Sequence, residues 1–289
     1  MGDWMTSKQF FLAAALGLAT TAMPVAGQVQ TIVPAVVSNA KPDTVEHIKV
    51  HGKSLEGNLE GESADREVIV FLPPSYAKDK HRHYPVVYAL HGYSIGAEQW
   101  THEIHVPQTI EGAFAQGSKE MIVVLPDTKT LHNGSMYSSS VTTGDFEKFI
   151  SHDLVVYIDA HYRTRADRLS RGLVGHSMGG YGATRIGMKH PDVFGSLYVL
   201  AKWTANAPLA FIDQYIDNLR EYRAIGIDVG DQDGLRNDTS KLHEVLDQYG
   251  IANSFEIYHG THISVVADRF QNHVMPFFSK NLCFQATCH

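Results

Sequence analysis

A serine between glycines is the strongest local signal for chemistry in this sequence. The segment Gly175-His176-Ser177-Met178-Gly179 matches the pattern G-x-S-x-G, with an apolar run before it and a helical pattern after it. A tight turn between a strand and a helix lifts a serine hydroxyl clear of the sheet, and small flanking residues are needed for the turn to close. We therefore predict that Ser177 is a nucleophile that attacks an ester carbonyl.

A serine hydroxyl is a weak nucleophile without a base, and after this kind of turn an acid and then a histidine follow in the chain. Three aspartates stand near the end of one later strand-like run, namely Asp228, Asp231 and Asp233. Asp228 lies inside the run, where its carboxylate would point at a face of the sheet, and Asp231 is typical of a turn former. We favour Asp233, on the loop after Gly230, as the acid that orients the histidine.

The candidate bases are the late histidines. His262 lies on the loop after the last strand-like run and just before the final helical pattern. His259 would end that strand and is expected to pack or bond locally. The others fall in predicted helices or at the end of the chain, and these are His243, His273 and His289. We predict that His262 is the general base, so that Ser177, Asp233 and His262 occupy three strand ends.

Acyl transfer also needs backbone N–H donors for the negative oxygen of the intermediate. One donor is expected from Met178, the residue after the nucleophile, and the second from Tyr93 on the loop after an earlier strand-like run. Gly92 permits the close backbone approach that this loop requires. We interpret His91 as a structural histidine that braces the loop rather than as a catalytic group.

Strand-like and helical patterns alternate along the chain and bring these residues to strand ends. Short apolar runs predict strands buried on both faces of a sheet, at 67–72, 85–90, 121–125, 172–175, 197–200, 224–229 and 255–258. Helical spacing predicts helices from Gly144 or Asp145 to near Arg163, and at 178–190, 239–249 and 265–278. The alternation indicates an α/β fold, with a mostly parallel central sheet and helices on both faces, in a single catalytic domain over 28–289.

Composition and charge fit an ordinary globular protein and argue against some partners. The 289 residues are 44% hydrophobic and 19% charged, and the net charge is −7. No run of lysine or arginine would follow a phosphate backbone, so no nucleic-acid partner is expected. His102, His105 and His132 form no i, i+4 ligand pair and are expected to be solvated loop residues. We therefore predict neither a metal nor another cofactor.

The first residues have the pattern of a secretory signal peptide. Lys8 precedes an apolar run at 10–19, and small residues follow. Such a run behind a positive charge, ending in a small-x-small site, is typical of a signal peptide, here over 1–27. The run is shorter than the roughly 20 apolar residues that span a bilayer, so a retained anchor is the less favoured alternative. We expect a mature chain from Gln28 with no membrane span.

The only two cysteines, Cys283 and Cys288, lie in the C-terminal tail. Their spacing and the lack of a second pair argue against a zinc site. In an oxidising compartment they would close a small loop and hold a tail that would otherwise fray. We expect a disulfide between them and, together with the signal peptide, a secreted or periplasmic protein.

Several motifs in chain order resemble the putative esterase family of α/β-hydrolases, which includes esterase D, feruloyl esterases and mycolyltransferases. The resemblance covers residues 65–280 and is carried by Phe71-Leu72-Pro73-Pro74-Ser75-Tyr76, Tyr84-Pro85-Val86-Val87-Tyr88-Ala89-Leu90-His91-Gly92, Ile122-Val123-Val124-Leu125-Pro126-Asp127, Asp159-Ala160-His161-Tyr162-Arg163-Thr164, residues 175–183 and His190-Pro191-Asp192-Val193-Phe194. It implies an α/β-hydrolase domain, no metal requirement, and acyl transfer to water or to an alcohol.

The residues that choose the substrate are less well defined. Esterases of this kind often carry a Ser-Gly pair after the strand that follows the nucleophile helix, whereas this chain reads Leu200-Ala201-Lys202-Trp203. Trp100, Tyr137 and Trp203 are expected on loops that overhang the strand ends, where they would form an apolar wall for an aryl or alkyl group. Packing beneath surface loops is the alternative for each of them.

The sequence thus predicts an exported serine esterase, with aryl or feruloyl-type esters among its candidate substrates. An acyltransferase would share every catalytic residue and would differ in admitting an alcohol in place of water. A peptidase or amidase is possible on the same three residues, but no feature favours it. A non-catalytic binding protein of this fold would be expected to have lost one of the three side chains or the oxyanion glycines.

Overall fold

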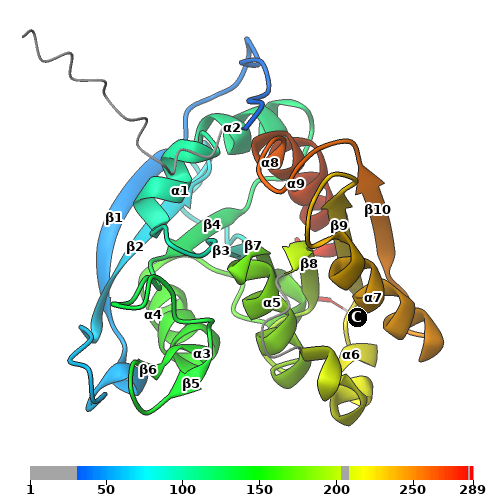
Figure 1. The fold of residues 1–289 in the computed structure, drawn as a ribbon. Coiled ribbons are helices and arrows are strands. Elements are labelled where there is room, and N and C mark those ends of the chain that lie inside the picture. The colour runs from blue at the N-terminus through cyan, green and yellow to red at the C-terminus, as the bar shows by residue number, and fades with distance from the viewer. Residues whose placement is uncertain (1–30, 203–207, 286, 289) are drawn as a thin grey trace, which may run out of the picture.

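An eight-stranded sheet forms the centre of the protein (Figure 1). The structure is a computed structural model that describes residues 31–202, 208–285 and 287–288. The strands lie in the order β1-β2-β4-β3-β7-β8-β9-β10. Their bounds are β1 Thr44–His51, β2 Asp65–Leu72, β3 Val86–Leu90, β4 Ile122–Pro126, β7 Arg171–Ser177, β8 Ser196–Lys202, β9 Ala224–Gly230 and β10 Ser254–Tyr258.

The sheet is antiparallel at one edge and parallel elsewhere. Strand β2 pairs antiparallel with both β1 and β4, whereas each pair from β4 to β10 runs parallel. Parallel strands bring their carboxyl ends to one edge, and the loops that leave this edge are where ligands bind in open α/β sheets. Strands β3, β4, β7 and β8 are buried along their whole length, as expected for short apolar runs covered on both faces.

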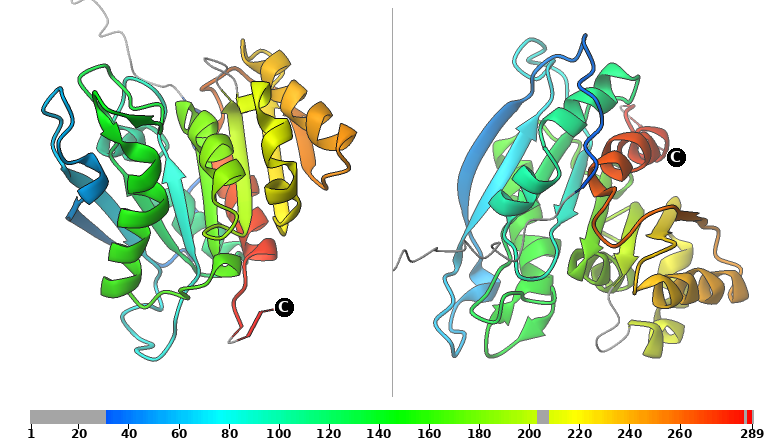
Figure 2. Two further views of the ribbon diagram at one scale, coloured as in Figure 1. Left: turned by 90° about the horizontal axis from the view of Figure 1, so that it is seen from below. Right: turned by 45° about the horizontal axis from the view of Figure 1, so that its top comes forward.

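Helices cover both faces of the sheet (Figure 2). One apolar cluster joins one face to the segments that contain α4, α5, α6 and α7, and a second joins the other face to those that contain α1, α2, α8 and α9. The bounds are α1 Ala97–Glu103, α2 Gln108–Ala115, α3 Phe146–Lys148, α4 Leu154–His161, α5 Met178–Lys189, α6 Ile216–Arg220, α7 Arg236–Gln248, α8 Val266–Arg269 and α9 Met275–Asn281.

The predicted fold class, a mostly parallel sheet with helices on both faces, is confirmed. The helix expected from 144 to 163 differs in detail, because Gly144–Asp145 (β6) pairs with Ser139–Ser140 (β5) before the helix begins. A π-helical turn at Phe149–Asp153 then joins α3 to α4, and a second one at Phe270–Val274 joins α8 to α9. Helix α7 begins at Arg236, three residues earlier than the pattern predicted.

The C-terminal tail carries the expected disulfide. Cys283 and Cys288 are bonded, with their Cα atoms 6.0 Å apart. The backbone N–H of Cys283 also bonds the carbonyl oxygen of Leu169, so the tail is held against the segment before β7. The predicted signal peptide over 1–27 and the predicted wall residue Trp203 lie outside the described residues. Over the ranges that are described, no helix is long and apolar enough to cross a membrane.

Candidate active site

Ser177 lies at the turn between β7 and α5, where the backbone has φ 58° and ψ −114°. A positive φ is unusual for a residue with a side chain and is held here by the elements on either side. Neither flanking glycine has room for a Cβ atom. At Gly175 a Cβ would lie 2.0 Å from the carbonyl oxygen of Gly179, and at Gly179 it would lie 2.0 Å from that of Leu90. Glycine is therefore required at both positions, because main-chain atoms approach too closely to leave room for a side chain.

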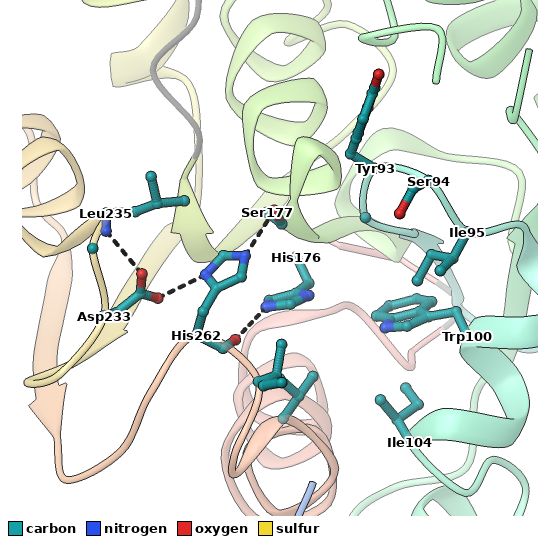
Figure 3. A pocket seen from close by; sticks show the side chains of 14 residues that line it. Tyr93, Ser94, Ile95, Trp100, Ile104, His176, Ser177, Asp233, Leu235 and His262 are labelled. Atoms are coloured by element: carbon teal, nitrogen blue, oxygen red, sulfur yellow. Dashed lines mark hydrogen bonds and ion pairs between the residues drawn. The ribbon is translucent and has the colours of Figure 1, made fainter. Parts of the chain in front are cut away.

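The ring of His262 bridges Ser177 and Asp233 (Figure 3). Its Nδ1 lies 2.8 Å from Oδ2 of Asp233, and its Nε2 lies 2.8 Å from Oγ of Ser177. A carboxylate only accepts hydrogen bonds, so Nδ1 carries the proton and Nε2 of the neutral ring can accept the serine proton. The three residues come from the ends of β7, β9 and β10, which meet at the carboxyl edge of the sheet.

Asp233 is ionised in a nearly closed environment. Only 1% of its side chain is exposed, against 32% for His262. Burial would raise the pKa of this carboxyl, but the bond from His262 and the N–H of Leu235, 2.8 Å from Oδ1, hold its pKa below the usual value. The carboxylate thus keeps its negative charge beside the imidazole.

The two other aspartates of this region have different partners. Asp231 accepts from the backbone N–H of Gly260 at 3.0 Å, which ties the acid loop to the loop of His262. Nδ1 of His259 also lies 3.0 Å from Asp231, but its side chain is 82% exposed, and such a surface pair contributes little. Asp228 is fully buried within β9 and bonds Nε of Arg269 at 2.8 Å and the hydroxyl of Tyr198 at 2.9 Å. Both are structural contacts, and neither carboxylate is bonded to His262.

The loop after β3 lies beside Ser177, as the predicted oxyanion donor at Tyr93 requires. A Cβ atom on Gly92 would lie 3.6 Å from Cβ of Ser177, so the backbone of this loop passes close to the serine. Met178 is the first residue of α5, whose N-terminal N–H groups and positive dipole end face the same place. At Gly134 a Cβ would lie 2.5 Å from Sδ of Met178 and 2.9 Å from Cδ2 of Tyr93, which places these side chains beside each other.

His91 has the bracing contacts expected of it. Its Nε2 accepts from the N–H of Thr128 at 2.9 Å, so Nδ1 carries the proton and donates to the carbonyl oxygen of Gly92 at 2.8 Å. Burial lowers the pKa of this histidine and keeps the ring neutral. His91 therefore fixes the backbone of the loop that leads to Tyr93.

A pocket of about 700 Å³ opens at Ser177, His262 and Asp233. Trp100 lies in helix α1 rather than on a loop, and it contributes to the lining of this pocket although it is only 1% exposed. Its ring packs edge-on against Phe270. Figure 3 shows Trp100 on the far side of His176 from His262. Among the described residues the remaining apolar lining comes from Ile95, Ile104, Leu235, Ile263 and Val266.

The placement of Tyr137 in this wall is wrong. Tyr137 is fully buried, and its hydroxyl donates to the carbonyl oxygen of His91 at 3.0 Å. A Cβ on Gly182 would lie 2.4 Å from Cδ2 of the tyrosine ring, so the ring packs against α5. Tyr137 supports the loop of His91 from inside the protein, which is the packing alternative considered above.

His176 is a pocket residue that the sequence analysis did not identify. Its Nε2 lies 2.8 Å from the backbone carbonyl oxygen of His262, and the two rings are 4.7 Å apart. The middle position of a G-x-S-x-G turn gives no sequence signal for such a contact, because its partner lies far along the chain.

The histidines expected to be solvated lie on the surface. The His102 and His132 side chains are 77% and 61% exposed and pair with Glu98 and Glu60 respectively. His105 is exposed as well. Within the described residues, no group of three or more histidine, cysteine or acidic side chains is placed to hold a metal ion.

The chain is similar in sequence to a known protein family. The model of the family described as "Putative esterase" matches residues 62–275. The chain belongs to the putative esterase family. The predicted family is thereby confirmed, and membership supports the predicted enzyme class, a serine hydrolase acting on carboxylic esters.

Individual proteins that are similar in sequence to this chain are also named as esterases. It is 28% identical over 170 residues to an endo-1,4-beta-xylanase/feruloyl esterase of Xylanibacter ruminicola, covering 57% of this chain and 22% of the relative. It is 32% identical over 132 residues to an esterase of Mycobacterium tuberculosis, covering 45% and 27%. The chain therefore spans about a quarter of the length of these curated relatives.

A solved ferulic acid esterase has a similar fold. The TM-score is 0.71 at 24% sequence identity, and the match covers 83% of this chain and 99% of the other. At this level of identity the similarity establishes the α/β-hydrolase fold.

Proposed function

We propose that this esterase is an exported serine hydrolase that cleaves carboxylic esters with Ser177 as nucleophile, His262 as base and Asp233 as orienting acid. The observation that carries the proposal is the pair of 2.8 Å contacts that join the three side chains through one imidazole. A nucleophile bonded to a base that is itself oriented by a third group is the arrangement that acyl transfer requires.

In the first step His262 takes the proton of Ser177 through Nε2 while Oγ attacks the ester carbonyl carbon. The imidazolium that forms is stabilised by the adjacent Asp233 carboxylate. The negative oxygen of the tetrahedral intermediate would be held by the backbone N–H groups of Met178 and Tyr93 and by the positive end of α5. Losing one such donor typically costs on the order of 10²–10³ in rate.

In the second step the C–O bond of the ester breaks, and His262 gives its proton to the departing alkoxide oxygen. The acyl group stays on Ser177 as an ester. Water then gives a proton to the neutral His262 and attacks the acyl carbon, and the second intermediate collapses to release the acid and to return the proton to Ser177. Atoms and charges balance over the cycle.

The pocket favours a neutral, apolar group beside the nucleophile. Among the described residues that line it, Asp233 is the only carboxylate, and no lysine or arginine is present. Ile95, Trp100 and Ile104 form an apolar wall on the side of His176 away from His262 (Figure 3). An aryl group would stack or pack against this wall, so aryl and feruloyl-type esters are the proposed substrates. Relatives that include a feruloyl esterase support this choice.

Hydrolysis of a graded set of esters tests the proposal. We expect wild-type protein to cleave p-nitrophenyl acetate and methyl ferulate, and Ser177→Ala to lose several orders of magnitude in kcat while folding normally. The matched control is His259→Asn, which alters a histidine of the same loop as His262 that contacts Asp231. An unchanged rate in Ser177→Ala would refute the assignment. Adding an alcohol acceptor and analysing products separates hydrolysis from acyl transfer.

A further inference from the structure

His176 contacts the proposed base from the residue next to the nucleophile. Its Nε2 lies 2.8 Å from the backbone carbonyl oxygen of His262. A carbonyl oxygen only accepts, so Nε2 of His176 carries the proton and donates it to this bond. The side chain is 5% exposed, and the two imidazole rings are tilted by 32° with centroids 4.7 Å apart. The reaction steps proposed for Ser177, His262 and Asp233 do not involve His176.

Two consecutive residues of the strand therefore hold two different parts of His262. Ser177 bonds the ring, and His176 bonds the main chain of the same residue. Strand β7 is buried over its whole length and lies in the middle of the sheet. His262, by contrast, lies on the loop between β10 and α8, next to the exposed Thr261. The bond from His176 thus connects a loop residue to a rigid strand.

The charge state of His176 suits this contact. Burial, and then the nearby His262, lower the pKa of His176 to about 3, while Asp233 acts in the opposite direction. The ring therefore stays neutral while His262 gains and loses its proton. A second positive charge at this distance would disfavour the imidazolium that forms during the reaction. A neutral N–H donor holds the main chain without that penalty.

We propose that His176 is a positioning residue for the reaction: its N–H fixes the backbone of His262, so that the imidazole keeps its contacts with Ser177 and Asp233 at the same time. The inference rests on the proposed function of these three residues and adds a fourth side chain to the machinery. Small displacements of a catalytic group lower the rate steeply, because proton transfer depends on distance and alignment.

The test compares variants that differ in their donor. His176→Phe keeps a ring and removes the N–H, His176→Asn has an amide too short to reach the carbonyl, and His176→Gln places an amide N–H at about the reach of Nε2. The control is His259→Phe, which removes a histidine outside the pocket. Each protein is titrated with a fluorophosphonate, and kcat and KM for p-nitrophenyl acetate are measured per reactive site across pH.

We expect kcat per reactive site to fall roughly tenfold in His176→Phe and His176→Asn, the effect of losing one hydrogen bond, with KM nearly unchanged. His176→Gln should recover a large part of the loss. His259→Phe should match wild type.

A wild-type kcat in the Phe and Asn variants would overturn the proposal. Equal losses in all three His176 variants, with no recovery in His176→Gln, would also overturn it, since that result indicates packing alone. A wild-type protein that neither reacts with the fluorophosphonate nor cleaves esters would instead refute the proposed function, and this inference with it. If His176→Phe does not fold, His176→Asn gives the same decision.

Discussion

At the residue scale, Asp233 is a nearly buried carboxyl group that its hydrogen bonds keep negatively charged. Its carboxylate receives the N–H of Leu235 on one oxygen and the ring of His262 on the other. These bonds lower its pKa below the usual value although burial acts in the opposite direction. The carboxylate therefore keeps its negative charge beside the ring of His262.

The first prediction concerns the replacement Asp233→Asn. The amide keeps the size of the side chain but can donate to Nδ1, which favours the imidazole tautomer that cannot accept the serine proton. We expect kcat to fall by about 10⁴-fold with a small change in KM. Steady-state kinetics on p-nitrophenyl acetate measure this. Asp231→Asn, on the same loop, is the control and should retain activity, and a comparable loss there would contradict the assignment of the acid.

The positions of some site residues can be predicted from local sequence patterns and from their order along the chain. Ser177 has its turn, and Asp233 and His262 each follow a strand-like run, so the positions to which the fold brings them can be predicted. The prediction for Tyr137 is wrong because no local sequence pattern indicates whether an aromatic side chain on a loop points to solvent or into the protein. His176 was missed because its partner is a backbone atom 86 residues away.

At the element scale, the junction of β7 and α5 depends on contacts between backbones. A Cβ on Gly179 would lie 2.0 Å from the carbonyl oxygen of Leu90 and 2.9 Å from that of His91. These are main-chain atoms of a buried strand and its loop, so they cannot move aside as a flexible side chain would. The start of α5 is therefore held against the loop that carries Tyr93.

The second prediction follows for Gly179→Ala. We expect the free energy of unfolding to fall by about 1–3 kcal/mol or more, because the methyl group overpacks the junction. Reactivity of Ser177 should fall as well, since the turn must shift. Urea denaturation measures the first effect. Gly234→Ala, where nothing lies within 4 Å of a Cβ, is the control for stability. Equal stability of the two variants would contradict this account of the junction.

Lys202, at the end of β8, pairs in register with Ser177 on the next strand. Its side chain is fully buried, and its Nζ has no hydrogen-bond partner within the part of the chain that is described. Burial lowers the pKa of Lys202 to about 8, while Asp238 acts in the opposite direction. An unpaired buried ammonium group destabilises the folded state, because its lost hydration is not replaced.

The third prediction is that Lys202→Met stabilises the protein at pH 7, by about 1–3 kcal/mol. The unfolded chain holds the lysine proton up to roughly pH 10.4, whereas the folded chain releases it near pH 8. Between these values the unfolded state binds more protons, so wild-type stability rises with pH and the advantage of the variant shrinks.

Urea denaturation at pH 7 and near pH 10 tests this linkage. Lys241→Met, which removes a lysine whose side chain is 52% exposed, is the control and should leave stability unchanged at both pH values. A Lys202→Met protein that is less stable than wild type at pH 7 would show that the ammonium group has a stabilising partner.

Elements with a strong pattern were predicted, and those without one were not. The buried central strands are continuous apolar runs and stand out in the sequence. Strand β1 is mostly exposed, with only Val50 buried, and so gave too few apolar residues to be recognised. The helices α1 and α2 are short, and their segments lacked a pattern long enough to be detected.

At the scale of the whole molecule, features at the two ends of the chain are the basis for its proposed cellular location. The C-terminal tail is closed by the bond between Cys283 and Cys288, which is compatible with an oxidising compartment. The N-terminal pattern of Lys8 followed by an apolar run is the basis for the proposed export.

The fourth prediction is that the protein leaves the cytoplasm and is cleaved before Gln28. Intact mass and N-terminal sequencing of the secreted or periplasmic fraction should give a chain that begins at Gln28. Its two cysteines should resist alkylation until a reductant is added. Lys8→Glu should lower the exported fraction, because a positive charge precedes the apolar run in signal peptides. Uncleaved protein confined to the cytoplasm would contradict the proposed export.

The most direct test of the central claim is the site at which a fluorophosphonate reacts. We predict a single covalent adduct on the peptide that contains Ser177, found by mass spectrometry. The adduct should be absent in Ser177→Ala, strongly reduced in His262→Asn, and unchanged in His259→Asn. Labelling of Ser177→Ala to the wild-type extent, or an adduct on another residue, would contradict the assignment of Ser177 as the nucleophile.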